Sequence, residues 1–393
     1  MKIAKEISEI FTSRFGHQPG LYRAPGRINL IGEHTDYNNG FVLPAAVNHA
    51  IYLAAAPNKL QKVRVYSVDF DELFEFDLAR VTDLQTDSWR SYVFGVVAVL
   101  YSRGYLLPGF DTVLQGDVPQ GAGMSSSAAL ECGVCCALND LFGLGLDKVE
   151  MTKIAQQAEH QYVGVMCGIM DQFASMMGRQ GHALLLDCRS LDYEHFPLEL
   201  QGAALLLLNS NVTHSLADTE YNVRRAQCEE GVSILQKRYP QVQSLRDVDL
   251  TMLNQEEGNM PAVVFKRCRY VLDESRRVHA FARAMRDGKL TEAGEILIAA
   301  QQAMSVEYEI TCPEIDFMAN FANRQPEVFG ARMMGGGFGG CTINLIRKGG
   351  AAHLIQRLSE AYRQAFNLDL TPIEITTADG AGRIDEFKRS RPA

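Results

Sequence analysis

The sequence contains 393 residues with a net charge of −9; 47% of the residues are hydrophobic and 22% are charged. This ordinary globular composition, at this length, fits two or three domains and a core that needs no disulfide or metal to stabilise it. An acidic chain without a broad basic footprint argues against nucleic acid as a partner. The longest uncharged apolar runs, such as 202–209, are far too short to span a bilayer, which argues against a membrane partner.

Nine cysteines are scattered along the chain, and the closest set is Cys132, Cys135 and Cys136. These three fall in an apolar helical pattern, and no second set of Cys or His residues accompanies them as a zinc or redox site would require. We interpret them as small buried residues in a reducing compartment. The chain opens on an amphipathic helix at 1–16 rather than on a signal peptide, so we expect a cytoplasmic location.

Strands and helices alternate along the rest of the chain. Apolar runs and apolar–polar alternation predict strands at 41–56, 63–68, 112–116, 183–187, 203–209, 341–346 and 372–377. Helical periodicity predicts helices at 91–101, from Ser125, from Asp147 with a cap-like Glu150, and at 169–177, 215–239 and 351–366, and helices dominate as far as Phe321. This pattern predicts an α/β or α+β fold. We place a domain boundary near 180–205, which gives domains of residues 1–195 and 196–393.

The segment 24–40, APGRINLIGEHTDYNNG, is unusually polar for its apolar content. It has neither a helical stripe nor a clean alternation, and its polar members are Arg27, Asn29, Glu33, His34, Asp36 and Tyr37. A solvated loop would not usually carry Ile28, Leu30 and Ile31, and a core segment would not hold so many ionisable groups. We therefore expect a partly buried polar cluster, whose partner must be rich in hydrogen-bonding groups; a sugar fits that description.

A second segment, PQGAGMSSSAA at 119–129, lies between a predicted strand and the start of a helix. Glycines allow the backbone to approach a ligand, and serines at a helix N-terminus offer hydroxyls and unpaired amides to an anion. Phosphate binding is one interpretation, and an ordinary serine-capped helix after a glycine turn is the other. The spacing excludes a Walker loop and a dinucleotide fingerprint.

Two further segments have equally plain alternatives. The run MGGGFGGCT at 334–342 holds five glycines in six positions, which predicts either close packing against a ligand or backbone or a structural turn before the strand at Cys341. In CGIMDQF, Gly168 can end one helix, and Asp171 then falls in the first turn of the next. A carboxylate at a helix start is favoured by the helix dipole alone.

Together and in this order, these segments resemble the GHMP small-molecule kinases. The first is similar, at every position from Gly26 to Tyr37, to the signature of the galactokinase family. The resemblance implies two lobes, each a mixed or antiparallel sheet with helices, and an active site between them. It implies transfer of the γ-phosphoryl group of ATP to the anomeric hydroxyl of galactose, with Mg²⁺, as a step of galactose metabolism. The expected partners are these small molecules, and the expected state is a monomer or a weak oligomer.

The resemblance also implies residue roles. The catalytic residues would be Asp171 and Arg27. The sugar would be held by Glu33, His34, Thr35, Asp36, Gly168 and Tyr221. The phosphates would be held by Gly121, Ala122, Gly123, Met124, Ser125, Ser126 and Ser127. The Mg²⁺ ligands, directly or through water, would be Ser127 and Glu159.

Trp89, Met334 and Asn29 remain outside these roles, and Met124, inside the phosphate set, departs from the family pattern. Trp89, the only tryptophan, is a candidate for the adenine pocket, although a core position is more often the role of a lone Trp. Met334 stands where the family has a small hydroxyl residue, and Met124 replaces the usual leucine, which conserves volume. Asn29 has no assigned role, and we expect its side chain to make a structural hydrogen bond.

The resemblance also implies that Arg27 lies beside Asp171, and the expected chemistry follows from this charge pair. An aspartate beside an arginine is a weak base, and a loose phosphoryl transition state does not require early proton removal. Asp171 would therefore orient the sugar hydroxyl and accept its proton late. Alternatives are a kinase for N-acetylgalactosamine or arabinose, or a sensor without turnover; the intact set of Arg27, Ser127, Glu159 and Asp171 favours an enzyme over a sensor. A dinucleotide-dependent oxidoreductase is excluded by the glycine spacing.

Overall fold

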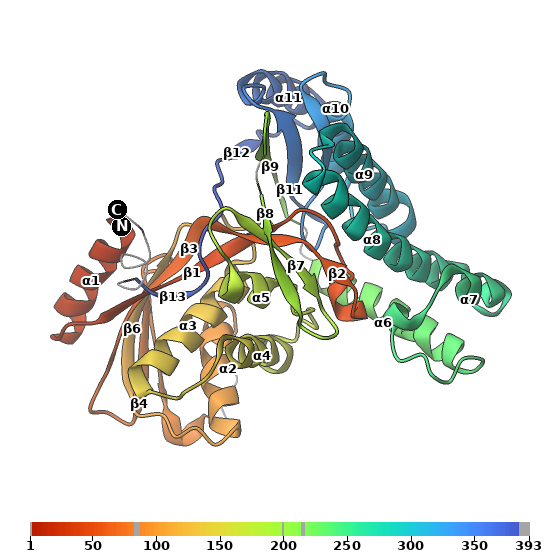
Figure 1. The fold of residues 1–393 in the computed structure, drawn as a ribbon. Helices are drawn as coiled ribbons and strands as arrows, with labels where there is room; N and C mark the ends of the chain where they lie inside the picture. The colour runs from red at the N-terminus through yellow and green to blue at the C-terminus, as the bar shows by residue number, and fades with distance from the viewer. Residues whose placement is uncertain (1, 82–86, 199, 214–216, 385–393) are drawn as a thin grey trace.

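The computed structural model describes residues 2–81, 87–198, 200–213 and 217–384. These residues form two main sheets, each with helices packed on it, and a small third sheet (Figure 1). The result is the mixed α/β class that the alternating pattern predicts.

The first sheet has six strands in the order β13-β1-β3-β6-β4-β5, and only the β4–β6 pairing is parallel. Its longest pairing joins β1 to β3 and is interrupted by an irregularity between Pro25 and Arg27. That irregularity re-aims the end of β1, where the polar segment begins. The bounds are β1 Gly20–Asn29, β3 Pro44–Pro57, β4 Lys62–Ser67, β5 Glu72–Asp77, β6 Phe110–Gly116 and β13 Gly382–Arg383.

Helices cover both faces of this sheet. Ile7 and Phe11, one turn apart on α1 (Lys2–Phe15), are fully buried against Tyr52 and Val113. On the opposite face, α3 (Ser126–Phe142) lies across β1 and β3, and it contributes the three clustered cysteines to the core. The neighbouring helices are α2 Trp89–Ser102, α4 Lys148–Ala158 and α5 Met170–Met177.

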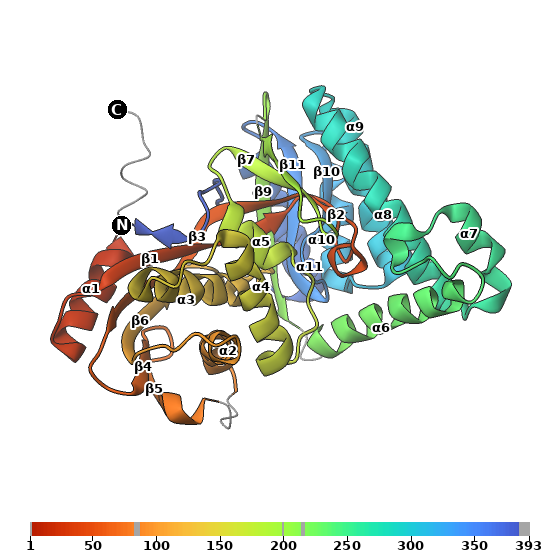
Figure 2. The ribbon, with the colours of Figure 1, turned by 60° about the horizontal axis from the view of Figure 1, so that its bottom comes forward.

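The second sheet has the order β10-β11-β9-β12 and is antiparallel throughout. Its strands are β9 Ala203–Thr213, β10 Val328–Met333, β11 Gly339–Arg347 and β12 Thr371–Ile373, and α10 (Pro313–Ala322) and α11 (Ala351–Phe366) pack on it. Helices α6 Ala217–Gln236, α7 Leu250–Gln255 and α8 Ala262–Arg286 form an arm that projects away from the sheets, and α9 (Leu290–Ala303) joins the arm to β10 (Figures 1 and 2). The third sheet is β2 Phe41–Val42, β7 His182–Asp187 and β8 Tyr193–Pro197.

Most predicted elements are present. Strand β4 shows the half-buried alternation, and Asp147 caps α4 by accepting a hydrogen bond from the Glu150 amide at 2.8 Å. Strands β1, β5, β8 and β10 were not predicted, because charged residues or glycines interrupt their alternation. The predicted start of the helix at Ser215 lies outside the described residues.

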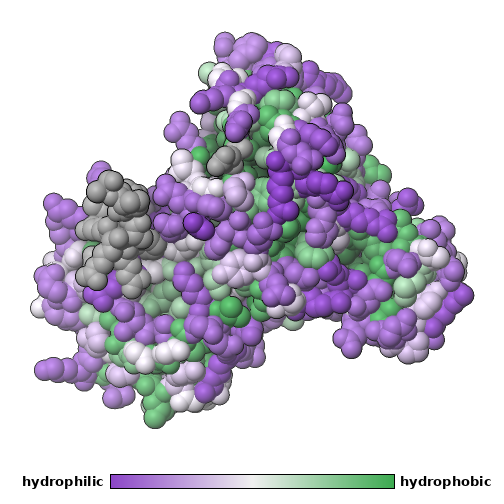
Figure 3. Space-filling view, viewed as in Figure 1, coloured by the Kyte–Doolittle hydropathy of each residue, from purple (hydrophilic) through white to green (hydrophobic). Residues whose placement is uncertain are grey.

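The chain returns to the first sheet at its far end. Strand β13 pairs with β1, and Thr377 forms a bridge with Val47. The domain division at residue 195 stays a prediction. All nine cysteines are free thiols. No helix in the described ranges is long and apolar enough to cross a membrane. On the face seen in Figure 3, hydrophilic side chains predominate and hydrophobic ones show mainly in recessed places.

Candidate active site

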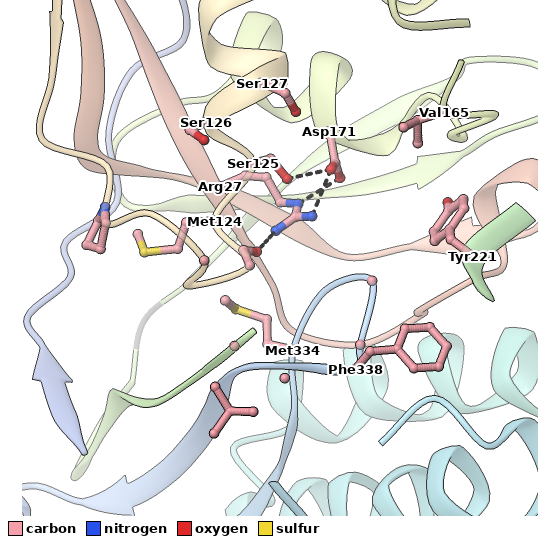
Figure 4. Close-up of a pocket in the computed structure, with 18 of the residues that line it drawn as sticks. Arg27, Met124, Ser125, Ser126, Ser127, Val165, Asp171, Tyr221, Met334 and Phe338 are labelled. Carbon is pink, nitrogen blue, oxygen red and sulfur yellow. Dashed lines mark hydrogen bonds and ion pairs between the residues drawn. The ribbon is translucent and has the colours of Figure 1, made fainter. Parts of the chain in front are cut away.

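A cavity of about 380 Å³ opens where elements of the two main sheets meet. Its walls are the loop before α3, which we call the serine loop (119–127), and the loop before β11, which we call the glycine loop (334–340). Arg27, Asp171 and Tyr221 also line it (Figure 4). The cavity therefore gathers segments from the whole length of the chain.

Arg27 and Asp171 form a bidentate ion pair in the cavity. Arg27 Nε and Nη2 donate to the two carboxylate oxygens of Asp171 at 2.7 and 2.8 Å. The arginine side chain is 4% exposed, whereas that of Asp171 is 26% exposed, so the carboxylate faces the open space. Burial alone would lower the pKa of Arg27, but the paired Asp171 raises it overall. A fork of this kind fixes the position of the carboxylate as well as its charge.

The serine loop is anchored on the same arginine. The Arg27 backbone N–H donates to the Met124 carbonyl at 3.0 Å, and Arg27 Nη1 donates to the Gly123 carbonyl. Ser125, at φ 56°, donates its hydroxyl to Asp171 Oδ2, and α3 begins at the next residue. This left-handed residue turns the chain so that the helix N-terminus faces the cavity, where its amides suit an anion.

The glycines of the two loops are required by close backbone contact. A Cβ on Gly335 would lie 3.0 Å from the Gly123 carbonyl oxygen, and one on Gly340 would lie 3.3 Å from that of Gly121. A Cβ on Gly26 would lie 2.7 Å from the Met124 oxygen. The glycine run thus packs against another backbone, one of the two interpretations open from sequence, and Ala122 is fully buried beneath the contact.

Glu33 lies behind the cavity, in contact with Arg332. Both residues are almost fully buried; Arg332 forms an ion pair with Glu33, and Glu33 Oε1 accepts the Gly335 amide at 3.1 Å. Arg332 also donates to the carbonyls of Leu30 and Asn29, both at 2.9 Å. Glu33 therefore ties the glycine loop to β1, and its predicted sugar contact stays a prediction.

Asp36 and Gly168 meet on the same side. A Cβ on Gly168 would lie 1.9 Å from Asp36 Oδ2, so only glycine leaves room for this carboxylate. Burial and the nearby Asp171 raise the pKa of Asp36 to about 6. Thr35 is fully buried, and its hydroxyl reaches the Gly32 and Phe41 carbonyls at 2.9 and 2.7 Å, which gives it a structural part in this turn.

His34 lies against the ring of Tyr221, with ring centroids 4.8 Å apart. Its Nε2 is 3.0 Å from the Gly336 carbonyl and its Nδ1 is 2.6 Å from the Tyr37 hydroxyl. Burial lowers the pKa of His34 to about 4. Both ring nitrogens are therefore engaged within the protein, and Tyr221 alone of the predicted sugar residues lines the cavity.

A buried group of acids stands beside the serine loop. Glu159, at the end of α4, accepts from Gln172 Nε2 at 2.6 Å and from the Cys167 thiol at 3.4 Å, and Gln172 also reaches Glu131 at 3.2 Å. Burial and then Asp171 raise the pKa of Glu159 to about 7, and burial and then Glu159 raise that of Glu131 far above its usual range. In the described part of the chain, no Lys, Arg or His nitrogen lies within ion-pair distance of either acid.

These acids fit a magnesium ion that arrives with a nucleotide. Hydroxyl and carboxylate oxygens are ligands that Mg²⁺ prefers, usually one or two of them together with substrate phosphates. The hydroxyl of Ser127 contributes to the pKa of Glu159 through a hydrogen bond, so the two predicted ligands are neighbours. Within the described ranges, no group of three or more His, Cys, Asp or Glu side chains is placed to hold a metal unaided.

A second cavity, of about 740 Å³, adjoins the first at Tyr92, Ser126 and Ser127. Trp89 lines it and stacks on Phe70 with ring centroids 6.0 Å apart and planes 6° apart. Trp89 is only 7% exposed and belongs to the main core cluster, as expected of a lone Trp, yet its ring also borders this cavity. A flat aromatic wall suits a nucleobase.

Sequence reasoning missed several residues of the site. Three buried residues were not predicted. Arg332 pairs with Glu33, Tyr308 bonds to Tyr37, and Arg224 donates to the Tyr308 carbonyl. An arginine three positions before the glycine run is a signal that could have drawn attention to Arg332. The structural hydrogen bond expected of Asn29 is wrong for its side chain: within the described residues, neither amide atom has a partner, whereas its backbone carbonyl accepts from Arg332. Met334 is 1% exposed and lines the first cavity.

Comparison with known proteins shows the class of this chain. The GHMP kinases N terminal domain matches residues 91–179, and the GHMP kinases C terminal matches residues 279–364. A crystal structure of a mevalonate kinase has a TM-score of 0.63 at 14% identity, covering 91% of this chain and 99% of that chain, which supports the fold alone. The architecture is therefore that of the GHMP kinases.

The family within that class follows from nearer relatives. The Galactokinase galactose-binding signature matches residues 9–57. Galactokinase from Thermotoga neapolitana is 40% identical over 362 residues, covering 92% of this chain and 99% of the relative, and that from Chloroflexus aurantiacus is 40% identical over 375 residues, covering 95% and 96%. The structure of Lactococcus lactis galactokinase complexed with galactose has a TM-score of 0.94 at 33% identity and covers 97% of this chain and 100% of that chain. This chain belongs to the galactokinase family, for which ATP is the expected phosphoryl donor.

Proposed function

We propose that this enzyme transfers the γ-phosphoryl group of ATP to the anomeric hydroxyl of galactose, giving galactose 1-phosphate and ADP. The observation that carries the proposal is the Arg27–Asp171 pair, with a partly exposed carboxylate in a cavity that the N-terminus of α3 borders. The galactokinase relatives and the galactose-binding signature support the choice of sugar.

The two cavities suggest how ATP lies. The base would enter the cavity beside Trp89, and the phosphates would cross Ser126 and Ser127, which both cavities share. The amides at the start of α3 then face the phosphates. The sugar would occupy the side of the first cavity between Asp171 and Tyr221.

Ser127 and Glu159 would hold Mg²⁺, which when bound neutralises charge on the β- and γ-phosphates. The chain's own residues do the rest. Asp171 accepts a hydrogen bond from the anomeric hydroxyl and orients its oxygen toward the γ-phosphorus, while Arg27 fixes the carboxylate and adds positive charge near the transferring group. As the oxygen–phosphorus bond forms and the bond to the leaving ADP oxygen breaks, the hydroxyl proton passes to Asp171. Late transfer suits a carboxylate already bonded to an arginine.

Sugar choice would come from paired hydrogen bonds. Asp36, whose pKa burial raises to about 6, has no cationic partner among the described residues and is available to sugar hydroxyls. An epimer that removes such a hydroxyl leaves a buried polar group unpaired, which can cost ~10⁴–10⁵ in specificity. Glucose should therefore be a poor substrate.

The deciding assay is ATP-dependent phosphorylation of galactose, measured by ADP release beside talose, glucose and N-acetylgalactosamine. We expect galactose to have the highest kcat/KM, and glucose to lie several orders of magnitude lower. Equal values for galactose and glucose, or a higher value for N-acetylgalactosamine, would overturn the choice of sugar. We also propose a cytoplasmic location, which the nine free thiols support.

A further inference from the structure

A series of hydrogen bonds through four side chains, Cys228, Tyr308, Tyr37 and His34, leads from the arm to the glycine loop. The Cys228 thiol lies 3.2 Å from the Tyr308 hydroxyl, which lies 2.8 Å from the Tyr37 hydroxyl, which lies 2.6 Å from His34 Nδ1. On its other side, His34 Nε2 lies 3.0 Å from the Gly336 carbonyl. Cys228, Tyr308 and His34 are buried, so water does not substitute for these bonds.

Counting the available protons fixes which group donates and which accepts in each hydrogen bond of this series. The Gly336 carbonyl can only accept, so His34 Nε2 must carry a hydrogen. The ring is neutral, since burial lowers the pKa of His34 to about 4, with Arg224 lowering it further, and no carboxylate of the described residues pairs with it. Nδ1 must therefore accept a hydrogen bond from the Tyr37 hydroxyl. Because the single hydroxyl proton of Tyr37 is used in that bond, Tyr37 must accept from Tyr308. By the same reasoning Tyr308 accepts from Cys228, whose thiol keeps its proton because burial raises its pKa to about 11.

The end of this hydrogen-bonded series that lies farthest from His34 is held rigidly. Tyr308 is the last residue of a π-helical turn, Met304–Tyr308, and its ring stacks on Tyr270 with centroids 4.2 Å apart. Arg224 donates to the carbonyls of Tyr308 and Glu309 at 2.8 and 2.7 Å, which satisfies the end of that turn. A π turn at the end of a helix often marks a functional position.

One helix face carries both this support and the predicted sugar residue. Tyr221, Arg224 and Cys228 stand at spacings of three and four on α6, so they share one face. Gly336 lies beside the Tyr221 ring, where an added Cβ would be 3.7 Å away. The bond from His34 therefore holds the glycine loop against the residue that faces the sugar.

We infer that Tyr37 and Tyr308 are positioning residues that hold His34 in its Nε2–H form, so that the ring fixes the glycine loop over the cavity in which phosphoryl transfer takes place. The loop needs such a support because five glycines in six positions leave its backbone unusually free. This inference rests on the proposed function, because its kinetic consequence is read through phosphoryl transfer.

The kinetic test uses a graded series of variants. Tyr37→Phe removes the donor to Nδ1 and should lower kcat by about 10-fold, the scale of one buried unsatisfied group. Tyr308→Phe leaves the Tyr37–His34 bond in place and should cost about 3-fold, and Cys228→Ala should cost less than about 2-fold. The matched control is Tyr362→Phe, because Tyr362 is fully buried and donates to the Ser210 carbonyl at 2.9 Å in a different core cluster. It should lower thermal stability about as much as Tyr37→Phe while leaving kcat unchanged.

A spectroscopic test reads the histidine directly. In the ¹⁵N-labelled wild-type enzyme, with the His34 signals assigned by their loss in His34→Gln, Nδ1 should be unprotonated and Nε2 protonated around neutral pH. In Tyr37→Phe the second tautomer should become populated, and in Tyr362→Phe the signals should not move. A wild-type ring in the Nδ1–H form, or charged, overturns the inference, as does a Tyr37→Phe variant that loses stability but keeps its kcat. Failure of the proposed function looks different: the wild-type enzyme would then release no ADP with galactose, while the ¹⁵N result would stand.

Discussion

The buried carboxylates around the site fall into two groups. Glu33 and Asp171 each pair with a buried arginine, Arg332 and Arg27 respectively. Asp36, Glu131 and Glu159 have no such partner in the described part of the chain, and burial raises the pKa of each. A buried charge without a partner is costly, so structures that keep one usually supply its partner from a ligand. Of the paired acids, Glu33 holds the glycine loop and Asp171 faces the cavity. The unpaired acids are those that we propose to meet sugar hydroxyls and the cation.

Replacing the paired acid in the cavity gives the largest expected effect. Asp171→Asn should lower the single-turnover rate by ~10²–10⁴, the usual contribution of a positioned proton acceptor. Galactose binding, measured by calorimetry, should persist, because an amide still accepts from the sugar hydroxyl. Single-turnover kinetics is preferred because slow product release can hide the loss. A rate within a few-fold of the parent would refute the assignment.

The unpaired group is tested first through Glu159. Glu159→Gln should weaken Mg²⁺ binding to the ADP complex by ~10–100-fold, because a carboxylate ligand is replaced by a neutral amide. In the parent enzyme, Mg²⁺ affinity should rise with pH through about 7, the raised pKa of Glu159, because the ion displaces its proton. Titration calorimetry at several pH values measures both effects.

The same raised pKa predicts how the folding stability of the nucleotide-free enzyme depends on pH. The raised pKa of Glu159 means that its protonated form stabilises the fold below its ordinary value of 4.5, and that this contribution is lost as pH rises through about 7. The Gln variant should lose that dependence. A metal affinity that is independent of pH in the parent enzyme would remove Glu159 from the metal site.

Asp36 is tested through the glycine that makes room for it. In Gly168→Ala the new Cβ, 1.9 Å from Asp36 Oδ2, must displace the carboxylate, so KM for galactose should rise by about 10-fold or more. The matched control is Gly258→Ala, because Gly258 has nothing within 4 Å of an added Cβ and no positive φ. Steady-state kinetics compares the two variants. Equal KM values would place the sugar away from Asp36.

The last prediction concerns stability rather than catalysis, and it tests a buried base without a carboxylate partner. The pKa of His34 falls from 6.5 to about 4 on burial, which corresponds to roughly 3 kcal/mol of stability. This contribution is complete above pH 6.5 and is lost as pH falls through about 4, because the unfolded chain then binds a proton that the folded chain refuses. His34→Gln should flatten the fall in denaturation midpoint over this window. An unchanged slope would show that His34 does not contribute to the acid sensitivity.

The sequence predicts the frame of this molecule better than the details of its site. Residue types at fixed spacing pick out the serine loop and the polar segment, because helix starts and glycine turns are local features. The role predicted for Asp171 comes from the family resemblance, since an acid at a helix start is ordinary. The pairing of Glu33 with Arg332 joins residues far apart in the chain, so no local pattern contains it. The same holds for the series of hydrogen bonds from Cys228 to His34. Strand β1 was missed because the irregularity at Pro25–Arg27 breaks the alternation by which a strand is recognised.

The return of the chain to its first sheet has a consequence for synthesis. Strand β1, which carries Arg27, has β3 on one side, and β13 at Gly382–Arg383 covers its other edge at Tyr22 and Arg23. While the ribosome is still making the middle of the chain, that edge has no partner, and exposed strand edges are sites of misassociation. The first part of this strand is therefore paired on both edges only after β13 has been translated, so a nascent chain should depend most on chaperones before that moment.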